Sequence, residues 1–571
     1  MTRFLVSLLL WAVAFPSLAP ALPAPTRPVE KRVTTTSVVT PQGTIVGSVS
    51  GNIENFGGIP FAEAPVGNLR LRPPQRLNSS LGTFDATGSG PSCPQMFFST
   101  TGDLVSSVLG LLINTPLFQV ATSQTEDCLT MRVQRPVGTT ADAKLPVLFW
   151  IYGGGFELGS PQLFDGGPFV ANGISQGKPF LFVSVNYRVG GFGFLAGKEI
   201  LADGAANLGL LDQRMGLEWV QDNIAAFGGD PEKVTIWGES AGAISVFDQM
   251  ALYGGDNTYN NKKLFRGGIM NSGSIVPADP VDCTRCQGIY DAVVEQAGCS
   301  QASDTLTCLR EADYDTFLHA ANSVPGVLSY SSLALSYLPR PDGVVLPDSP
   351  NVLAAKGQYA AVPMIIGDQE DEGTLFSLFQ PNITTKERLI DYFVTVLFLD
   401  ADRDDIEAFV DTYDPSPAAG SPFRTGLLNN PYPEFKRLAA MLGDLVFTLT
   451  RRLFLTSTLT VNPDVPAWSY IASYDYGTPI LGTFHASDLL QVFYGVLPNY
   501  ASRTIQSYYI SFLYNGDPND PDNTDIPEWP QWNRDDKQLM QFFNDRASLL
   551  TDDFRQASCD WIEAHVDVLH V

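Results

Sequence analysis

Histidine and basic residues are scarce in this sequence. Its 571 residues include four histidines, and 35 Lys and Arg stand against 61 Asp and Glu, which gives a formal net charge of −26. Such an acidic chain repels phosphate backbones and has no basic stripe, so we expect no nucleic-acid partner. Any chemistry that needs an imidazole base has only His319, His485, His565 and His570 as candidates.

Long apolar runs are absent beyond the N-terminus. An apolar run from Phe4 to about Leu18 precedes Ala19-Pro-Ala21, which predicts a signal peptide over residues 1–21. A membrane anchor is the alternative, but the run is shorter than the roughly 18 to 20 apolar residues that a span needs. A proline-rich stretch ending at Lys31-Arg32 predicts a pro-segment over residues 22–32. We therefore expect a secreted, extracellular protein without a transmembrane segment.

Removal of residues 1–32 makes the chain more acidic. Four basic residues and one acidic residue leave with it, so the net charge changes from −26 to −29. No low-complexity linker or internal repeat follows Arg32, and we expect residues 33–571 to form one domain, as a monomer or weak homodimer. The sequons at Asn78 and Asn382 fit a secreted glycoprotein.

Seven cysteines in a secreted chain predict disulfides, not metal ligation, and we expect no metal and no cofactor. The odd number leaves one thiol unpaired unless it links two chains. Cys283-Thr-Arg-Cys286 could be a redox motif, but it lies in a turn-rich segment without a flanking βαβ pattern, which argues against that interpretation.

The central motif is Gly238-Glu-Ser-Ala-Gly242, which interrupts a β-prone run beginning at Val234 and precedes residues compatible with a helix. This arrangement predicts a nucleophile elbow, in which Ser240 sits on a strained turn with its hydroxyl exposed above a parallel sheet. A chance match in a glycine-rich chain is the alternative. The neighbouring segments decide between the two.

Apolar runs that end in glycine or polar residues predict the strands of this sheet; they cover residues 145–152, 180–185, 234–237, 268–270, 362–366 and 468–474. Residues 212–227 have helical spacing between the second and third runs. The pattern predicts an α/β fold with a large, mostly parallel central sheet and helices on both faces. Residues 33–140 predict short strands and irregular structure, with a hairpin near 46–49 and a turn at 56–61. Residues 301–355 and 384–456 are expected to be helix-rich insertions that build pocket walls.

A nucleophilic serine needs a base, an acid that orients the base, and donors for the oxyanion. Elimination favours His485 as the base. His565 and His570 lie at the extreme C-terminus, and His319 lies in a helix ahead of the expected acid, whereas His485 follows the last predicted strand in a loop. A purely structural loop histidine is the alternative.

The acid is expected after the strand at 362–366, where Asp368, Glu370, Asp371 and Glu372 all occur. The residues alone do not choose among these four, and a solvated acidic loop is the alternative. The expected oxyanion donors are the amides of Gly154 and Gly155, which follow a strand, and of Ala241, which follows the nucleophile.

The segment between Cys93 and Cys128 is unusually apolar. Asp103 is its only charged residue from Pro94 to Thr125, and apolar residues at helical spacing follow Asp103. A core helix is one interpretation. The functional interpretation is a lid that covers a pocket in water and turns toward a lipid–water interface when open.

Several motifs together resemble the type-B carboxylesterase and lipase family of α/β-hydrolases, and within it the secreted fungal lipases of the Candida rugosa type. These motifs are residues 56–70, Glu126-Asp-Cys-Leu129, Gly153-Gly-Gly-Phe156, Asn186-Tyr-Arg188, Gly238–Gly242, Asp371-Glu-Gly-Thr374 and Phe484-His485. The resemblance implies that Glu372 is the acid, that Phe156, Leu375 and Phe376 line the substrate pocket, and that the loop at about 93–128 is the lid.

The resemblance also implies two disulfides, Cys93 with Cys128 and Cys299 with Cys308. It leaves Cys283, Cys286 and Cys559 unassigned, because the CxxC segment has no place in the family pattern. Met131-Arg132 is a second, modest departure.

These features predict a secreted serine hydrolase that cleaves carboxylic esters, with a lipid as the expected substrate, through an acyl-enzyme and the triad Ser240, His485 and Glu372. A non-lipolytic carboxylesterase acting on soluble or aromatic esters is the first alternative. A non-catalytic adhesion module on the same fold is the second, although such relatives lack triad residues.

Overall fold

The computed structural model describes residues 34–97, 123–474, 477–493 and 498–570. The predicted signal peptide, the pro-segment and the apolar helix predicted after Asp103 lie outside these residues. Within the described part, the chain from Thr35 onward forms one compact unit.

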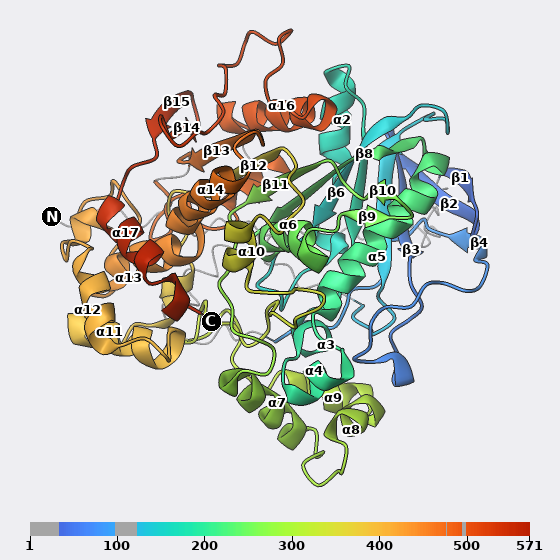
Figure 1. Cartoon of the computed structure of the whole chain (residues 1–571). Coiled ribbons are helices and arrows are strands. Elements are labelled where there is room, and N and C mark those ends of the chain that lie inside the picture. Colours follow the sequence, from blue (N-terminus) through green and yellow to red (C-terminus); the bar gives the residue numbers. More distant parts are fainter. Residues whose placement is uncertain (1–33, 98–122, 475–476, 494–497, 571) are drawn as a thin grey trace, which may run out of the picture. The chain divides into compact units, whose positions relative to one another are not determined.

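One large mixed sheet forms the centre of this unit (Figure 1). Its spatial order is β1-β2-β3-β5-β7-β6-β8-β11-β12-β13-β14-β15, with β4 beside β2. The strands are β1 Thr35–Thr40, β2 Gly43–Ser50, β3 Ile53–Pro60, β4 Gly82–Asp85, β5 Thr130–Pro136, β6 Leu145–Ile151, β7 Leu181–Val185, β8 Gly229–Glu239, β11 Gly267–Asn271, β12 Met364–Gln369, β13 Ala467–Ala472, β14 Gln538–Phe542 and β15 Ala547–Thr551. Neighbouring strands from β7 to β14 run parallel, as the near-continuous apolar runs predicted.

Helices cover both faces of the sheet. They are α2 Gly167–Ser175, α3 Gly190–Phe194, α4 Lys198–Asp203, α5 Leu208–Asn223, α6 Ala241–Ala251, α7 Thr284–Gln296, α8 Thr305–Glu311, α9 Tyr314–Ala321, α10 Pro350–Lys356, α11 Lys386–Tyr392, α12 Arg403–Asp411, α13 Phe435–Gly443, α14 Leu449–Val461, α15 Ser487–Val492, α16 Tyr500–Asn515 and α17 Gln556–Ala564. Successive residues of β8 point to opposite faces. Ile236 lies on the side of α6, whereas the Trp237 ring packs against Phe169 of α2 and Tyr509 of α16. The predicted fold class is confirmed.

Two sequence expectations differ from the structure. The segment 56–61, expected to be a turn, lies mostly within β3, and its glycines produce a register shift between Phe56 and Ile59. A Cβ on Gly57 would lie 2.1 Å from the Gly88 carbonyl oxygen, so the glycine permits a close chain approach. The insertion at 301–355 is helical only in part, because residues 322–349 between α9 and α10 contain four prolines and form turns and bends.

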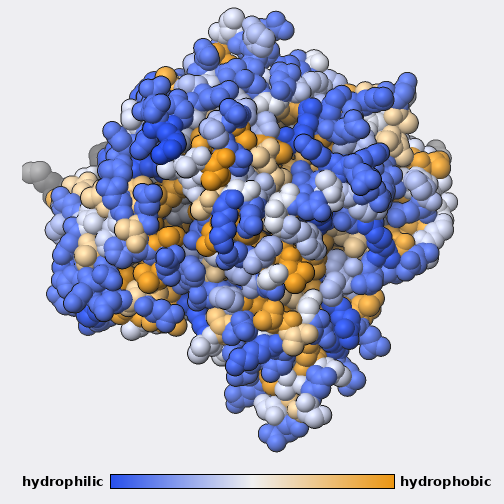
Figure 2. Space-filling view, in the orientation of Figure 1, coloured by the Kyte–Doolittle hydropathy of each residue, from blue (hydrophilic) through white to orange (hydrophobic). Residues whose placement is uncertain are grey.

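The face of the molecule in Figure 2 is mostly hydrophilic, with apolar side chains in small separate groups. Among the described residues, no helix is long and apolar enough to cross a membrane.

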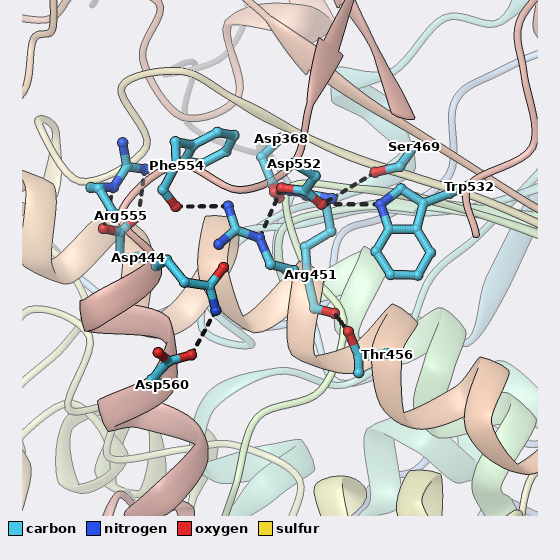
Figure 3. A network of polar contacts seen from close by, with 12 residues as sticks. Asp368, Asp444, Arg451, Thr456, Ser469, Trp532, Asp552, Phe554, Arg555 and Asp560 are labelled. Atoms are coloured by element: carbon cyan, nitrogen blue, oxygen red, sulfur yellow. Dashed lines mark hydrogen bonds and ion pairs between the residues drawn. The ribbon is translucent and has the colours of Figure 1, made fainter. Parts of the chain in front are cut away.

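A buried ionic network fastens the C-terminal part of the sheet (Figure 3). Arg451 of α14 binds Asp368 of β12 at 2.9 Å and Asp552 at 2.8 Å, and Arg452 binds Asp552 at 3.0 Å. Trp532 donates its indole N–H to the same Asp552 carboxylate at 3.1 Å. The network therefore holds the strand that precedes the expected catalytic acid.

Candidate active site

Ser240 lies at the sharp turn between β8 and α6. Its backbone has φ 57° and ψ −126°, a conformation that non-glycine residues rarely adopt. A Cβ on Gly238 would lie 2.2 Å from the Gly242 backbone, and a Cβ on Gly242 would lie 2.1 Å from the Ile151 carbonyl oxygen. A side chain at either position would therefore collide with neighbouring backbone, so both positions require glycine. The Ser240 amide donates to the Asn271 carbonyl oxygen at 2.9 Å. The predicted elbow geometry is present.

His485 reaches the serine from the loop that follows β13. Its Nε2 lies 2.8 Å from Ser240 Oγ and its Nδ1 lies 2.5 Å from Glu372 Oε2. The rings of Phe376 and Phe447 pack against the imidazole, with centroid distances of 5.0 and 4.6 Å. The other histidines lie elsewhere: the Nδ1 of His319 contacts a carbonyl within α9.

The four carboxylates at and after the end of β12 have four different partners. Asp368 belongs to the arginine network, and Glu370 forms an ion pair with Arg424. Glu372 is the one that meets His485, and its second oxygen accepts from the Gln369 amide at 2.6 Å. The residues alone left open which of the four carboxylates pairs with the histidine, and the tertiary contacts single out Glu372.

Asp371 connects the loop that carries Glu372 with the loop that carries His485. Its oxygens accept from Ser421 Oγ and the Phe423 amide at 2.8 Å and from the Thr483 amide at 2.9 Å. Burial, and then the nearby Glu370 charge, raise the pKa of Asp371 to about 7. Asp371 therefore helps to hold Glu372 and His485 in position relative to each other, without contacting Ser240.

The proposed oxyanion donors lie beside Ser240. Gly154 and Gly155 have φ of 117° and 64°, and Gly153, just before them, passes so close to the elbow that a Cβ there would lie 2.8 Å from Ser240 Cβ. Within the described part of the chain, the amides of Gly154, Gly155 and Ala241 have no hydrogen-bond acceptor. Three donors in this arrangement suit a developing negative charge.

A cavity of about 570 Å³ opens at the serine. Phe156, Leu375 and Phe376 line it, and so do Met96, Phe97 and Gln124 at the described ends of the Cys93–Cys128 loop. The predicted insertions supply a part of the remaining wall, including the π-helical turn η9 (Asp444–Thr448) before α14, and segments near the serine and near the C-terminus supply the rest. Nearly all lining side chains are apolar, which suits a hydrocarbon substrate.

Sequence reasoning missed two carboxyl groups near His485. Glu239 Oε1 lies 3.4 Å from His485 Nε2, and Asp488 accepts from the Asn271 side chain at 2.7 Å. Burial, and then the charges of Asp488 and Glu372, raise the pKa of Glu239 well above its ordinary value. Burial raises the pKa of Asp488 to about 6. Glu239 stands within the motif itself, but only the fold reveals its proximity to the imidazole.

The structure pairs Cys93 with Cys128 and Cys299 with Cys308, as the resemblance implied, and it also pairs Cys283 with Cys286. Cys559 is buried and free. Asn78 and Asn382 are both exposed. Among the described residues, no group of three or more His, Cys, Asp or Glu side chains could hold a metal ion.

Comparison with known proteins places this fold and site in a class. The sequence profile of the carboxylesterase family matches residues 34–561. The chain belongs to this family and is a carboxylic ester hydrolase on the α/β-hydrolase fold.

Individual relatives within this family include secreted fungal lipases and an esterase. One relative is a protein from Gibberella zeae named secreted triacylglycerol lipase LIP1. The chain is 60% identical to it over 557 residues, which cover 97% of this chain and 94% of the relative. It is 48% identical over 468 residues, 82% of this chain and 84% of the relative, to Lipase 2 of Diutina rugosa. The crystal structure of Aspergillus niger EstA matches with a TM-score of 0.78 at 26% identity, covering 94% of this chain and 99% of that one. The predicted resemblance and the predicted secretion are confirmed.

Proposed function

We propose that this enzyme hydrolyses lipid esters, including acylglycerols, through a covalent acyl-serine intermediate. The observation that carries the proposal is the continuous hydrogen-bonded chain from Ser240 through His485 to Glu372 at the mouth of an apolar cavity.

Acylation begins when Ser240 Oγ attacks the ester carbonyl carbon while His485 Nε2 takes the hydroxyl proton. Glu372 holds the opposite ring nitrogen and stabilises the imidazolium that forms. The carbonyl oxygen becomes an oxyanion and accepts hydrogen bonds from the amides of Gly154, Gly155 and Ala241. When the tetrahedral intermediate collapses, His485 returns the proton to the leaving alcohol, and the acyl group stays on Ser240.

Deacylation repeats these steps with water as the nucleophile. His485 takes a proton from the water, the hydroxide adds to the acyl carbon, and the proton then passes to Ser240 Oγ as the acid leaves. The serine and imidazole are restored, so the cycle consumes one ester and one water.

Replacement of Ser240 with alanine tests the chemistry. We expect Ser240→Ala to lower kcat for a chromogenic ester by at least about 10⁴-fold with an unchanged melting temperature, because no other group can form the acyl-enzyme. Ser175→Ala, at an exposed serine of α2, is the matched control and should leave the rate unchanged. Full activity of Ser240→Ala would overturn the assignment and favour the non-catalytic alternative.

The lipid substrate is tested separately. The cavity's apolar lining supports long acyl chains, so we expect hydrolysis of an emulsified long-chain triacylglycerol as well as of a water-soluble short-chain ester. Activity on the soluble ester alone would favour the non-lipolytic carboxylesterase.

A further inference from the structure

The Cys283-Thr-Arg-Cys286 segment, which the catalytic site does not use, forms a closed loop at the start of α7. Its two cysteines are disulfide-bonded, and Cys283 Sγ also accepts a hydrogen bond from the Cys286 amide at 3.0 Å. The Cys283 amide donates to the Pro280 carbonyl oxygen at 3.0 Å. Arg285 is thereby held in a loop that has little freedom.

Arg285 joins two separate parts of the cavity wall. Its Nη1 donates to the Leu397 carbonyl oxygen at 3.3 Å, and its Nη2 donates to the Ala334 carbonyl oxygen at 3.2 Å. Leu397 lines the cavity, and so do Leu333 and Leu335 on either side of Ala334. Because a planar guanidinium carries fixed donors on two nitrogens, it can bridge two carbonyls in a way that the single ammonium of lysine does not reproduce.

The same segment also reaches the C-terminus. Asp279, just before the loop, forms an ion pair with His570 at 3.1 Å, and the preceding residue, Leu569, lines the cavity. Ile275, Val276 and Pro277 line it too. Wall segments from three distant parts of the sequence therefore meet around this one loop.

Part of the cavity wall leads away from the serine along α14, against which α17 packs, and we call this part the distal wall. Val446, Thr450 and Leu453 line one wall, and Ile562, Val566 and Leu569 line another. The first set has the spacing i, i+4, i+7 of one helical face, which extends about 10 Å at 1.5 Å per residue. In the second set, Ile562 lies in α17, which ends at Ala564, and Val566 and Leu569 lie in and after the 3-10 turn that follows. The first set begins next to Phe447, which packs on His485, and the Thr450 hydroxyl is satisfied by the Leu445 carbonyl oxygen. A short acyl group would stay near Ser240, whereas a long one would extend between these walls.

We propose that Arg285, held by the Cys283–Cys286 disulfide, is a positioning residue that fixes the distal wall of the cavity and thereby determines the preference for long acyl chains. The inference rests on the proposed function, because it assigns the distal cavity to the acyl chain. Arg285 itself does not line the cavity and takes no part in the bond changes.

The test compares kcat/KM for p-nitrophenyl palmitate and p-nitrophenyl butyrate. In Arg285→Met, we expect the palmitate-to-butyrate ratio to fall by about tenfold, the effect of roughly two methylene groups losing their contact with the wall. Arg266→Met is the matched control, because Arg266 also bridges two carbonyls, those of Leu513 and Tyr514, and neither residue lines the cavity. Its ratio should stay unchanged.

A double variant, Cys283→Ser with Cys286→Ser, keeps Arg285 but opens the loop. We expect the ratio to fall in the same direction by a smaller factor, and this variant serves as the test if Arg285→Met does not fold. An unchanged ratio in a folded variant, or an equal loss for both esters, would overturn the inference. Failure of the proposed function would look different, since Ser240→Ala would then retain hydrolysis of the butyrate ester.

Discussion

Two buried clusters of charge lie along β12 and the loop after it, and they are built in opposite ways. In the part of the Figure 3 network around Asp552, Arg451 and Arg452 bind the carboxylates of Asp368 and Asp552, and each of the four side chains is at most 2% exposed. At the candidate active site, three buried carboxyl groups lie near His485, those of Glu239, Glu372 and Asp488, and within the described part of the chain no arginine forms an ion pair with any of them.

The pKa values of Asp552 and Glu239 express this difference. Burial alone would raise the pKa of Asp552, but Arg451 and Arg452 outweigh it, and the pKa lies below its ordinary value. At Asp368, by contrast, burial outweighs Arg451 and raises the pKa well above its ordinary value. Glu239 is also buried, its Oε1 has no hydrogen-bond donor among the described residues, and its pKa is strongly raised. The first cluster pairs its carboxylates with arginines, whereas the second places carboxyl groups without an arginine where an imidazolium has to form during the reaction.

The largest expected effect removes the negative charge behind the imidazole. Glu372→Gln should lower kcat by about 10³- to 10⁴-fold, because the neutral amide cannot stabilise the imidazolium and favours the wrong tautomer. Glu370→Gln, two residues away in the ion pair with Arg424, is the control and should retain kcat. The kcat of both variants is measured with a soluble chromogenic ester. A wild-type kcat in Glu372→Gln would show that Glu372 is not the acid of the triad.

The next effect concerns the arginine network and stability. Arg451→Met should lower the free energy of unfolding by about 3–5 kcal/mol, because it leaves Asp368 and Asp552 buried without their main partner. Arg546→Met removes an exposed ion pair with Asp545 and should cost less than about 1 kcal/mol. Urea unfolding compares the two variants. Equal losses would mean that the buried network has no special role in stability.

Only part of the active-site cluster could be predicted from the sequence. The elbow and His485 follow from local signals, namely glycines around a serine and the scarcity of histidine. Glu372 could not be separated from Asp368, Glu370 and Asp371 by local reasoning, because their different roles depend on partners such as Arg451, Arg424 and Thr483, which lie some 50 to 110 residues away. The proximity of Glu239 to His485 is likewise a product of the fold.

The same limit applies to the cavity. The helix-rich insertions were predicted to form walls, and Val446, Thr450 and Leu453 do lie in the insertion at 384–456. The other distal residues come from α17 and the C-terminus, which the sequence did not indicate. Nothing local in Ile562 or Leu569 distinguishes a cavity wall from a core residue, since both are buried apolar side chains. The Cys283–Cys286 pairing was left open because this CxxC segment has no place in the family pattern, and the structure supplies the pairing.

The smallest expected effect is a change in the pH dependence of stability at Glu157, a buried carboxyl beside the oxyanion loop that forms no ion pair within the described residues. Burial raises its pKa from 4.5 to about 8, although the Val327 amide donates to it. A group whose folded-state pKa is raised stabilises the fold fully below its unfolded pKa and loses this contribution as pH rises toward the folded value. The melting temperature of the wild type should therefore fall between about pH 5 and about pH 8.

Glu157→Gln removes this titration while its amide oxygen can still accept from Val327, so its melting temperature should fall less over the same range. Asp371 and Asp488 titrate with the same sign in both proteins, so the difference between the two curves isolates Glu157. Glu232→Gln, at an exposed position, is the control and should follow the wild-type curve. Parallel curves for wild type and Glu157→Gln would show that this carboxyl is ionised in the folded enzyme, and the contrast with the arginine-paired cluster would then be confined to the immediate surroundings of His485.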